Sequence, residues 1–255
     1  MSHAKKGIRI LVIPDAHARP NYNNKRFDAL GNFIVRKKPD RVVCIGDWAD
    51  MASLSMYDKG RKAAEGKRYQ HDIDAANDAL HRVMTKVQRG LGKDAPPFDV
   101  TLGNHEGRID RHVEANPELE GKLSIDNIEF KKWGWKVHPY LEPLVLQDIL
   151  FQHSLPSGPL GKPTSGVNHA RSLILKAMMS TVVGHSHQRD FYETTRADHR
   201  KMFGLVVGCF DEGPHAYAHS TQHNWWSGLV MLNEAHRGSA EPAFYSMDYL
   251  KRKFV

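Results

Sequence analysis

Two histidines, His185 and His187, stand one residue apart at the end of an apolar run, in the segment VVGHSH of residues 182–187. In an extended segment residues i and i+2 point to the same face, so both imidazoles could approach one small object. A metal ion is the simplest such object, because neutral imidazole is the commonest metal ligand. The chain has 16 histidines, so the pair alone could also be a surface turn. The residues at the ends of the other expected strands distinguish a metal site from a surface turn.

The first 130 residues alternate short apolar runs with amphipathic stretches. This alternation predicts β-α-β-α-β and therefore a parallel sheet with right-handed crossovers. The expected strands are 8–15, 41–47 and 98–104, and the expected helices are 25–38 and 70–90.

The second half changes character and predicts a second, largely antiparallel sheet with one interposed helix at 170–179. The Gly-, Pro- and Ser-rich stretch 154–168 predicts a loop at the rim of a site. No repeat or low-complexity linker separates the halves, so we expect a single domain over 1–255. The expected strands are 142–154, 180–187, 189–198, 201–210, 226–235 and 243–250.

Composition limits the size of the core, the role of the cysteines, the compartment and the charge of the partners. With 255 residues, 25% charged and 40% hydrophobic, the chain should bury a large core. Cys44 and Cys209 lie in apolar runs without CxxC spacing, which predicts reduced core residues. Neither a membrane span nor a signal peptide is expected, so cytoplasm is the default compartment. The net charge of +7 favours anionic partners, although a mixed solvated surface explains it equally well.

Polar side chains follow five expected strands in succession. Each alone could be a cap, an Asx turn or a half-buried imidazole, but these explanations account poorly for the recurrence. In open α/β sheets ligands gather at the carboxyl ends of strands. The residues concerned are Asp15 and His17, Asp47 and Asp50, Asn104 and His105, His153, and His185 and His187.

This ordered set resembles the calcineurin-like metallophosphoesterase superfamily, whose blocks are D-x-H, G-D-x-x-D, G-N-H-[DE], a lone His and G-H-x-H. The resemblance implies two mixed β-sheets packed in a sandwich flanked by helices. It also implies two divalent metal ions. The implied ligands are Asp15, His17 and His187 for one ion, Asn104, His153 and His185 for the other, and Asp47 bridging both.

The same resemblance gives His105 and Asp50 catalytic roles. Two divalent ions about 3.5–4 Å apart can activate a bridging hydroxide and clamp a phosphoryl group during in-line displacement. His105 would ligate neither ion and would protonate the leaving oxygen or stabilise charge there. Asp50 would orient His105. Imidazole and oxygen ligands without thiolate suit Mn²⁺, which we expect, and also Fe, Zn or Ni. Gly184 would permit close backbone approach.

Differences from the motifs of individual subfamilies limit the classes of substrate that the enzyme could act on. Ala18 and Met51 replace residues typical of the protein phosphatases, and only 68 residues follow His187, which leaves little room for the capping domain of DNA repair nucleases. The chain is most similar to the small, cap-free phage and bacterial enzymes. We expect a phosphodiesterase acting on nucleic acid or a nucleotide. The alternatives are a phosphomonoesterase acting on nucleotides, small metabolites or phosphoprotein, and a binding module without turnover.

Two further groups of residues are candidates for substrate binding. Guanidinium groups can grip phosphate bidentately, and the arginines near the blocks are Arg19, Arg108, Arg171 and Arg189. A C-terminal cluster could touch a nucleobase, although tryptophans at such spacing commonly pack in cores or loops. It comprises His215, His219, His223, Trp225 and Trp226.

Overall fold

The first sheet has six strands in the order β13-β12-β1-β2-β3-β4. The computed structural model describes residues 7–213, 215 and 219–255. Strands β1 to β4 run parallel, whereas β12 is antiparallel to β1 and β13 is antiparallel to β12. The strands are β1 (Ile8–Ile13), β2 (Arg41–Cys44), β3 (Phe98–Thr101), β4 (Lys136–His138), β12 (Gly228–His236) and β13 (Ser239–Ser246).

The second sheet has five strands in the order β10-β11-β9-β6-β5. The expectation that it is largely antiparallel is wrong, because β9 pairs in parallel with both β6 and β11. Helix α4 (His169–Ala177) provides the crossover from β6 to β9, and such a connection makes two neighbouring strands parallel. The strands are β5 (Leu144–Leu146), β6 (Ile149–Phe151), β9 (Ser180–Val183), β10 (Arg189–Thr195) and β11 (Lys201–Val207).

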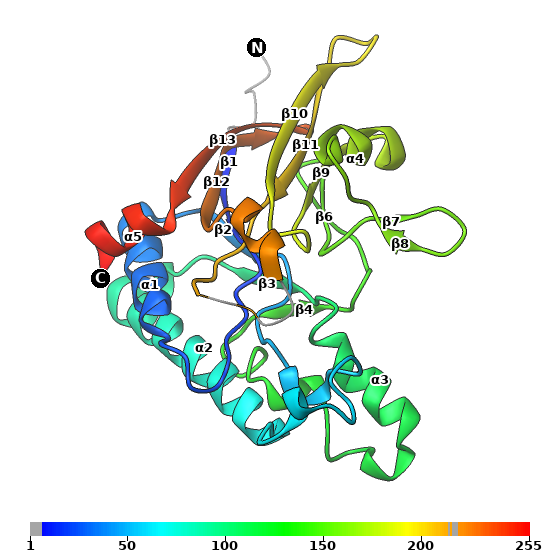
Figure 1. The fold of residues 1–255 in the computed structure, drawn as a ribbon. Coiled ribbons are helices and arrows are strands. Elements are labelled where there is room, and N and C mark those ends of the chain that lie inside the picture. The colour runs from blue at the N-terminus through cyan, green and yellow to red at the C-terminus, as the bar shows by residue number, and fades with distance from the viewer. Residues whose placement is uncertain (1–6, 214, 216–218) are drawn as a thin grey trace.

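Three groups of buried apolar side chains hold four layers together. Along β1, Leu11 and Ile13 pack toward the helices, whereas Ile10 and Val12 pack between the two sheets, as the two-residue period of a strand requires. Helices α1 (Lys25–Lys37), α2 (Tyr69–Leu91) and α5 (Met247–Phe254) cover the first sheet, and α4 covers the second (Figure 1). The fold is therefore the expected sandwich of two mixed sheets flanked by helices.

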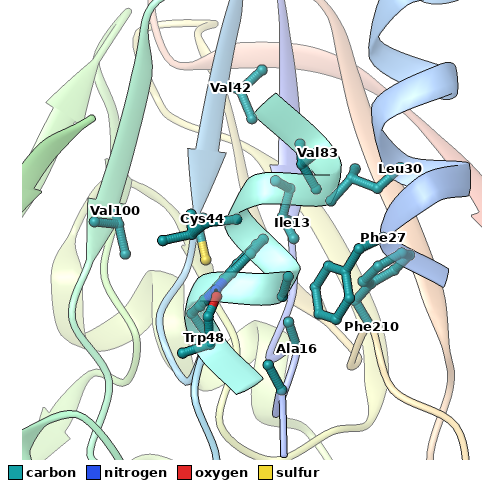
Figure 2. Packing of buried hydrophobic residues seen from close by; sticks show 14 of the residues in the cluster. Ile13, Ala16, Phe27, Leu30, Val42, Cys44, Trp48, Val83, Val100 and Phe210 are labelled. Atoms are coloured by element: carbon teal, nitrogen blue, oxygen red, sulfur yellow. The ribbon is translucent and has the colours of Figure 1, made fainter. Parts of the chain in front are cut away.

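The core beneath α1 and α2 reaches the loops that follow the first two strands. Trp48 is fully buried, lies against Phe27 of α1 with ring centres 5.0 Å apart, and donates from its indole nitrogen to the carbonyl of Ala76 in α2 (Figure 2). Phe210, just beyond β11, packs on Phe27 from the other side at 5.8 Å. Aromatic packing thus anchors the backbone beside the strand ends.

The structure differs from the expected elements at two hairpins and a helix. Segment 142–154 is a hairpin of β5 and β6, whose turn residues Gln147 and Asp148 both have positive φ. Segment 243–250 is a strand only to Ser246, because Met247 and Leu250 are buried at helical spacing and the Ser246 hydroxyl accepts from the Tyr249 amide, which begins α5. The stretch 154–168 contains the short hairpin of β7 (Pro156–Ser157) and β8 (Lys162–Pro163).

Several smaller elements were not expected from the sequence. They are α3 (Gly107–Ala115), β4, and the 3-10 turns Ala52–Leu54, Lys62–Ala64, Gly92–Asp94, Pro117–Leu119, Ile125–Asn127 and His219–Asn224. Among the described residues, none of the helices combines the length and apolar character needed to cross a bilayer. Cys44 and Cys209 are both buried and unbridged, as expected, and burial raises the pKa of Cys209 to about 12.

Candidate metal centre

All seven predicted ligands lie together at one edge of the sandwich. They follow the carboxyl ends of β1, β2 and β3 in the first sheet and of β6 and β9 in the second. Five of them, Asp15, His17, Asp47, His153 and His187, are buried, and each of these is at most 5% exposed. The fold therefore assembles the centre from both sheets.

Asp15, His17 and His187 form the first cluster. The Nε2 atoms of His17 and His187 are 3.0 Å apart, and Nε2 of His187 is 3.2 Å from Oδ2 of Asp15. Two donors that bind one ion at about 2.1 Å are separated by about 3.0–3.4 Å. The observed spacing matches that of ligand atoms around a shared cation.

The second cluster is formed by Asn104, His153 and His185. Oδ1 of Asn104 lies 2.9 Å from Nε2 of His153 and 2.8 Å from Nδ1 of His185. The two imidazole nitrogens are 3.2 Å apart. His153 donates from its other nitrogen, Nδ1, to the carbonyl of Ile45 at 3.0 Å, which orients Nε2 toward the cluster.

Asp47 lies between the two clusters. Its Oδ2 atom is 3.3 Å from Nε2 of His153, and its carboxylate also groups with His17 of the first cluster. The backbone amide of His105 donates to the other oxygen, Oδ1, at 2.9 Å, which holds the carboxylate in place. This is the position that a bridging ligand requires.

The protonation states of the clustered side chains near pH 7 favour metal binding. Burial and the neighbouring imidazoles lower the pKa of His17 to about 4, and burial together with His153 lowers the pKa of His185 to about 4. Both rings are therefore neutral near pH 7, the form in which imidazole ligates metals. Burial alone would raise the pKa of Asp47, but His105 and His153 hold it below its usual range.

An unsatisfied oxygen supports the same conclusion. Oδ1 of Asp15 is buried and lacks a hydrogen-bond partner within the described part of the chain, a costly arrangement for a carboxylate unless a cation compensates it. The donor set of imidazoles, carboxylates and one amide oxygen fits a pair of divalent ions.

The backbone at the centre adopts left-handed conformations. His17, Asp47, His185 and His187 have φ of 43°, 48°, 67° and 58°, each costing about 1–3 kcal/mol. The expectation that His185 and His187 share one face of an extended segment is therefore wrong. They lie in a turn after β9, and their imidazoles reach different clusters, as the resemblance implied. The amides of Ala16 and His17 both donate to the carbonyl of Asp47 at 2.9 Å, which joins the first two loops.

Two glycines permit close approach at the centre. A Cβ atom on Gly184 would lie 2.1 Å from Oδ1 of Asp15, and one on Gly103 would lie 2.1 Å from Oδ1 of Asp47. Any larger residue at either position would displace the carboxylate of a predicted metal ligand.

His105 and Asp50 contact each other beside the clusters. Nδ1 of His105 is 3.2 Å from Oδ1 of Asp50 and 2.6 Å from its carbonyl oxygen. Although burial would lower it, the carboxylates of Asp47 and Asp50 raise the pKa of His105 to about 8. The imidazole can therefore carry a proton near pH 7. Asp50 also lies 3.3 Å from Nδ1 of His17, a contact that the sequence did not predict.

Glu106 has a structural role that sequence reasoning missed. Its carboxylate is 1% exposed and accepts from three backbone amides, those of Asp47 at 3.0 Å, Ala49 at 2.9 Å and Gly103 at 2.8 Å. It therefore fixes the loops after β2 and β3 to one another. Glu106 occupies the fourth position of the G-N-H-[DE] block, and this position could have identified it in the sequence.

A buried ion pair supports the loop after β1. The Arg26 guanidinium donates to the carbonyl of Ala16 at 2.7 Å and lies 3.3 Å from Oδ1 of Asp211. Both residues could have been noticed in the sequence, because Arg26 shares a helix face with Leu30 and Phe33, and Asp211 follows the apolar run of β11.

Two of the four candidate arginines lie at the centre. Arg108 donates to the carbonyl of Asp50 at 2.9 Å, and its Nη2 is 3.2 Å from Nε2 of His105. Arg19 donates to the Asp211 carboxylate at 2.6 Å. Arg171 lies on α4 over the ring of Tyr192, and Arg189 lies on the rings of Trp226 and Phe244, so neither joins the clusters.

Part of the C-terminal cluster borders the first metal cluster. The ring of Trp225 meets that of His187 edge-on with centres 4.1 Å apart, and the ring of His215 lies 5.3 Å from that of His17. Trp226 packs on Phe244, and His223 is exposed on the last 3-10 turn. The side chain of His219 lies outside the described residues.

Comparison with known proteins agrees with this geometry. A family model described as calcineurin-like phosphoesterase matches residues 8–194. The relatives include the Gene 54 proteins of Mycobacterium phages D29 and L5, 26% and 24% identical over 233 residues, with 88% of each chain covered.

Solved structures similar to this one include Yfce, a phosphoesterase from E. coli, at 12% identity and a TM-score of 0.40, covering 92% of this chain and 98% of that one. Another is a dimetal phosphatase from Danio rerio at 12% identity and a TM-score of 0.38, covering 95% and 100%. Since the family model spans well over half of the residues and the two ligand clusters stand at its strand ends, the chain belongs to the calcineurin-like phosphoesterase family.

Proposed function

We propose that this protein is a dinuclear-metal phosphodiesterase that hydrolyses nucleic acid or nucleotide diesters. The observation that carries the proposal is the pair of ligand clusters on either side of Asp47. Two divalent ions in such a centre lower the pKa of a water molecule and withdraw charge from the phosphoryl oxygens. We expect Mn²⁺, and Fe, Zn or Ni would also suit these ligands.

The side chains around the clusters have separate tasks in this proposal. His105 donates a proton to the leaving oxygen, because its imidazole is protonated near pH 7 and its Nε2 atom lies 3.8 Å from Oδ2 of Asp47, farther apart than the ligand pairs of either cluster. Asp50 orients that ring through Nδ1. Arg108, whose guanidinium lies beside His105, binds a non-bridging phosphate oxygen.

The charge balance favours a diester over a monoester. A monoester dianion carries one more negative charge than a diester and needs correspondingly more positive charge around it. Arg19 is already paired with the carboxylate of Asp211, so its charge is largely compensated. Arg108 donates to carbonyl oxygens and, together with the protonated His105, supplies the protein's positive charge at the centre.

The chain after the centre is consistent with a cap-free enzyme. In its described part, residues beyond His187 form β10 to β13, the 3-10 turn His219–Asn224 and α5, which belong to the two sheets and their helical cover. An extended polymer could therefore reach the strand ends. The phage origin of the relatives makes the bacterial cytoplasm the compartment in which we expect the enzyme to act.

Paired chromogenic substrates test the proposal. We expect bis(4-nitrophenyl) phosphate to be hydrolysed with a higher kcat/KM than 4-nitrophenyl phosphate when Mn²⁺ is added, and single- and double-stranded nucleic acids then define the polymer. A preference for the monoester would instead identify a phosphomonoesterase. If neither substrate turns over with any of the four metals, the binding-module alternative replaces the enzyme.

A further inference from the structure

A cavity lined mostly by aromatic residues lies close to the chain segment that carries His187, since Arg189 is one of its lining residues. Its volume is about 370 Å³. It opens where β12 and β10 begin and β13 ends, and β12 is antiparallel to β1, whose carboxyl end carries Asp15. We refer to it as the aromatic pocket, and its lining residues are Arg189, Trp226, Phe244, Tyr245, Ser246 and Tyr249.

The indole of Trp226 forms a fixed wall of this pocket. The Trp226 amide donates to the carbonyl of the metal-centre residue His187 at 2.9 Å. Two glycines make room for the ring, because a Cβ atom on Gly208 would lie 2.6 Å from Cε3 and one on Gly228 would lie 2.8 Å from Cη2. Phe244 meets the indole edge-on at 5.7 Å. The ring is therefore held rigidly and is tied directly to the metal centre.

Arg189 supplies a positive charge to the same pocket. Its guanidinium carbon lies 5.2 Å from the centre of the Trp226 ring and 5.1 Å from that of Phe244. Its side chain forms no hydrogen bond or ion pair with the residues that the structure describes. A guanidinium that rests on aromatic faces and lacks a carboxylate partner is suited to bind phosphate bidentately.

We propose that the aromatic pocket binds a nucleotide of a single-stranded nucleic acid substrate, with its base against Trp226 and its phosphate at Arg189. Stacked aromatic rings combined with basic side chains are the usual means of binding single strands without sequence preference. This inference rests on the proposed phosphodiesterase function and specifies its substrate. The bond between the Trp226 amide and the His187 carbonyl holds one wall residue of the pocket beside a predicted metal ligand, so a strand bound in the pocket could continue to the metal centre.

Fluorescence anisotropy of a labelled ten-residue oligothymidylate tests this binding without hydrolysis. The full chain is titrated in the presence of chelator, and the variants compared are Arg189→Glu and Arg89→Glu. Arg89 is a matched control, because it makes the same charge change at an exposed position near the end of α2. A second variant, Tyr249→Ala, removes a half-buried ring of the pocket that also packs on Tyr245 and Phe254, so its folding is checked by thermal unfolding.

We expect the wild type and Arg89→Glu to bind the oligonucleotide equally, and Arg189→Glu and Tyr249→Ala each to bind at least about tenfold more weakly. Failure of the wild type to bind, or equal losses in Arg189→Glu and Arg89→Glu, would overturn the inference. The outcome is separable from that of the enzyme assay. Hydrolysis of bis(4-nitrophenyl) phosphate without oligonucleotide binding would contradict only the aromatic-pocket proposal. Oligonucleotide binding without hydrolysis would contradict only the proposed phosphodiesterase function.

Discussion

Oδ1 of Asp50 lies 3.3 Å from Nδ1 of His17, a predicted ligand in the first cluster. The same oxygen is 3.2 Å from Nδ1 of His105. One buried carboxylate therefore faces both a predicted metal ligand and the proposed proton donor. Hydrogen-bonded carboxylates behind ligand imidazoles fix the ring orientation and raise ligand basicity.

Asp50→Asn should consequently affect two properties. From the sequence alone, this substitution is expected only to misorient His105. The contact between Asp50 and His17 predicts that metal binding will weaken as well. We expect metal affinity to fall by about 10–100-fold together with kcat. Titration of metal into the chelated variant measures the first effect. A variant with wild-type metal affinity would show that Asp50 acts on His105 alone.

Asp47→Asn should remove the two-metal state. The amide keeps the shape of the carboxylate and can still accept from the His105 amide, but it loses the charge that lets two cations lie close together. We expect about one equivalent of bound metal by elemental analysis and nearly complete loss of turnover. Asp74→Asn, at an exposed position of α2, is the control. Two equivalents at wild-type affinity would contradict the bridging role.

His105→Ala should separate chemistry from metal binding. Both metals should be retained, while kcat falls by about 10²–10⁴ because general acid catalysis is lost. Diesters with good leaving groups need little protonation and should be affected least. The comparison uses bis(4-nitrophenyl) phosphate, which has a good leaving group, and a dinucleotide, which has a poor one. His71→Ala, at an exposed position of α2, is the control. Loss of a metal ion in His105→Ala would mean that the roles within Gly-Asn-His-Glu are assigned wrongly.

The strand-end pattern was predictable because it is local. An apolar run followed by Asp15, Asp47, Asn104, His153 or His185 identifies both the strand and the residue at its end, and parallel strands bring such ends to one edge. The helix face of α2 was predictable for the same reason, since Ile73, Ala76, Leu80 and Val83 repeat at helical spacing.

Contacts between distant segments were not predictable. The Arg26–Asp211 pair joins residues 185 positions apart, and the left-handed φ of His17 and Asp47 is imposed by the backbone bonds between their loops. At 243–250 the residue types suit a strand as well as a helix. There the burial of Met247 and Leu250 by tertiary packing decides in favour of α5.

Glu106→Gln tests whether the loops are fixed as the structure indicates. A glutamine would turn its NH₂ group toward at least one of the three amides that Glu106 now accepts from, leaving a buried donor unsatisfied. We expect the free energy of unfolding to fall by about 1–3 kcal/mol in chemical denaturation. Glu114→Gln, exposed on α3, should cause no such change. Equal stability of the two variants would show that the buried carboxylate is dispensable.

The most direct test of a two-ion phosphoesterase is the number of bound metal ions measured alongside turnover. The protein is exhaustively chelated, its metal content is determined, and Mn²⁺ is added back while hydrolysis of bis(4-nitrophenyl) phosphate is followed. Because we assign the seven clustered side chains as ligands of the ions and not as nucleophiles, we predict no activity in the chelated protein and recovery that saturates at two equivalents. Full activity with negligible bound metal, or recovery complete at one equivalent, would contradict the account.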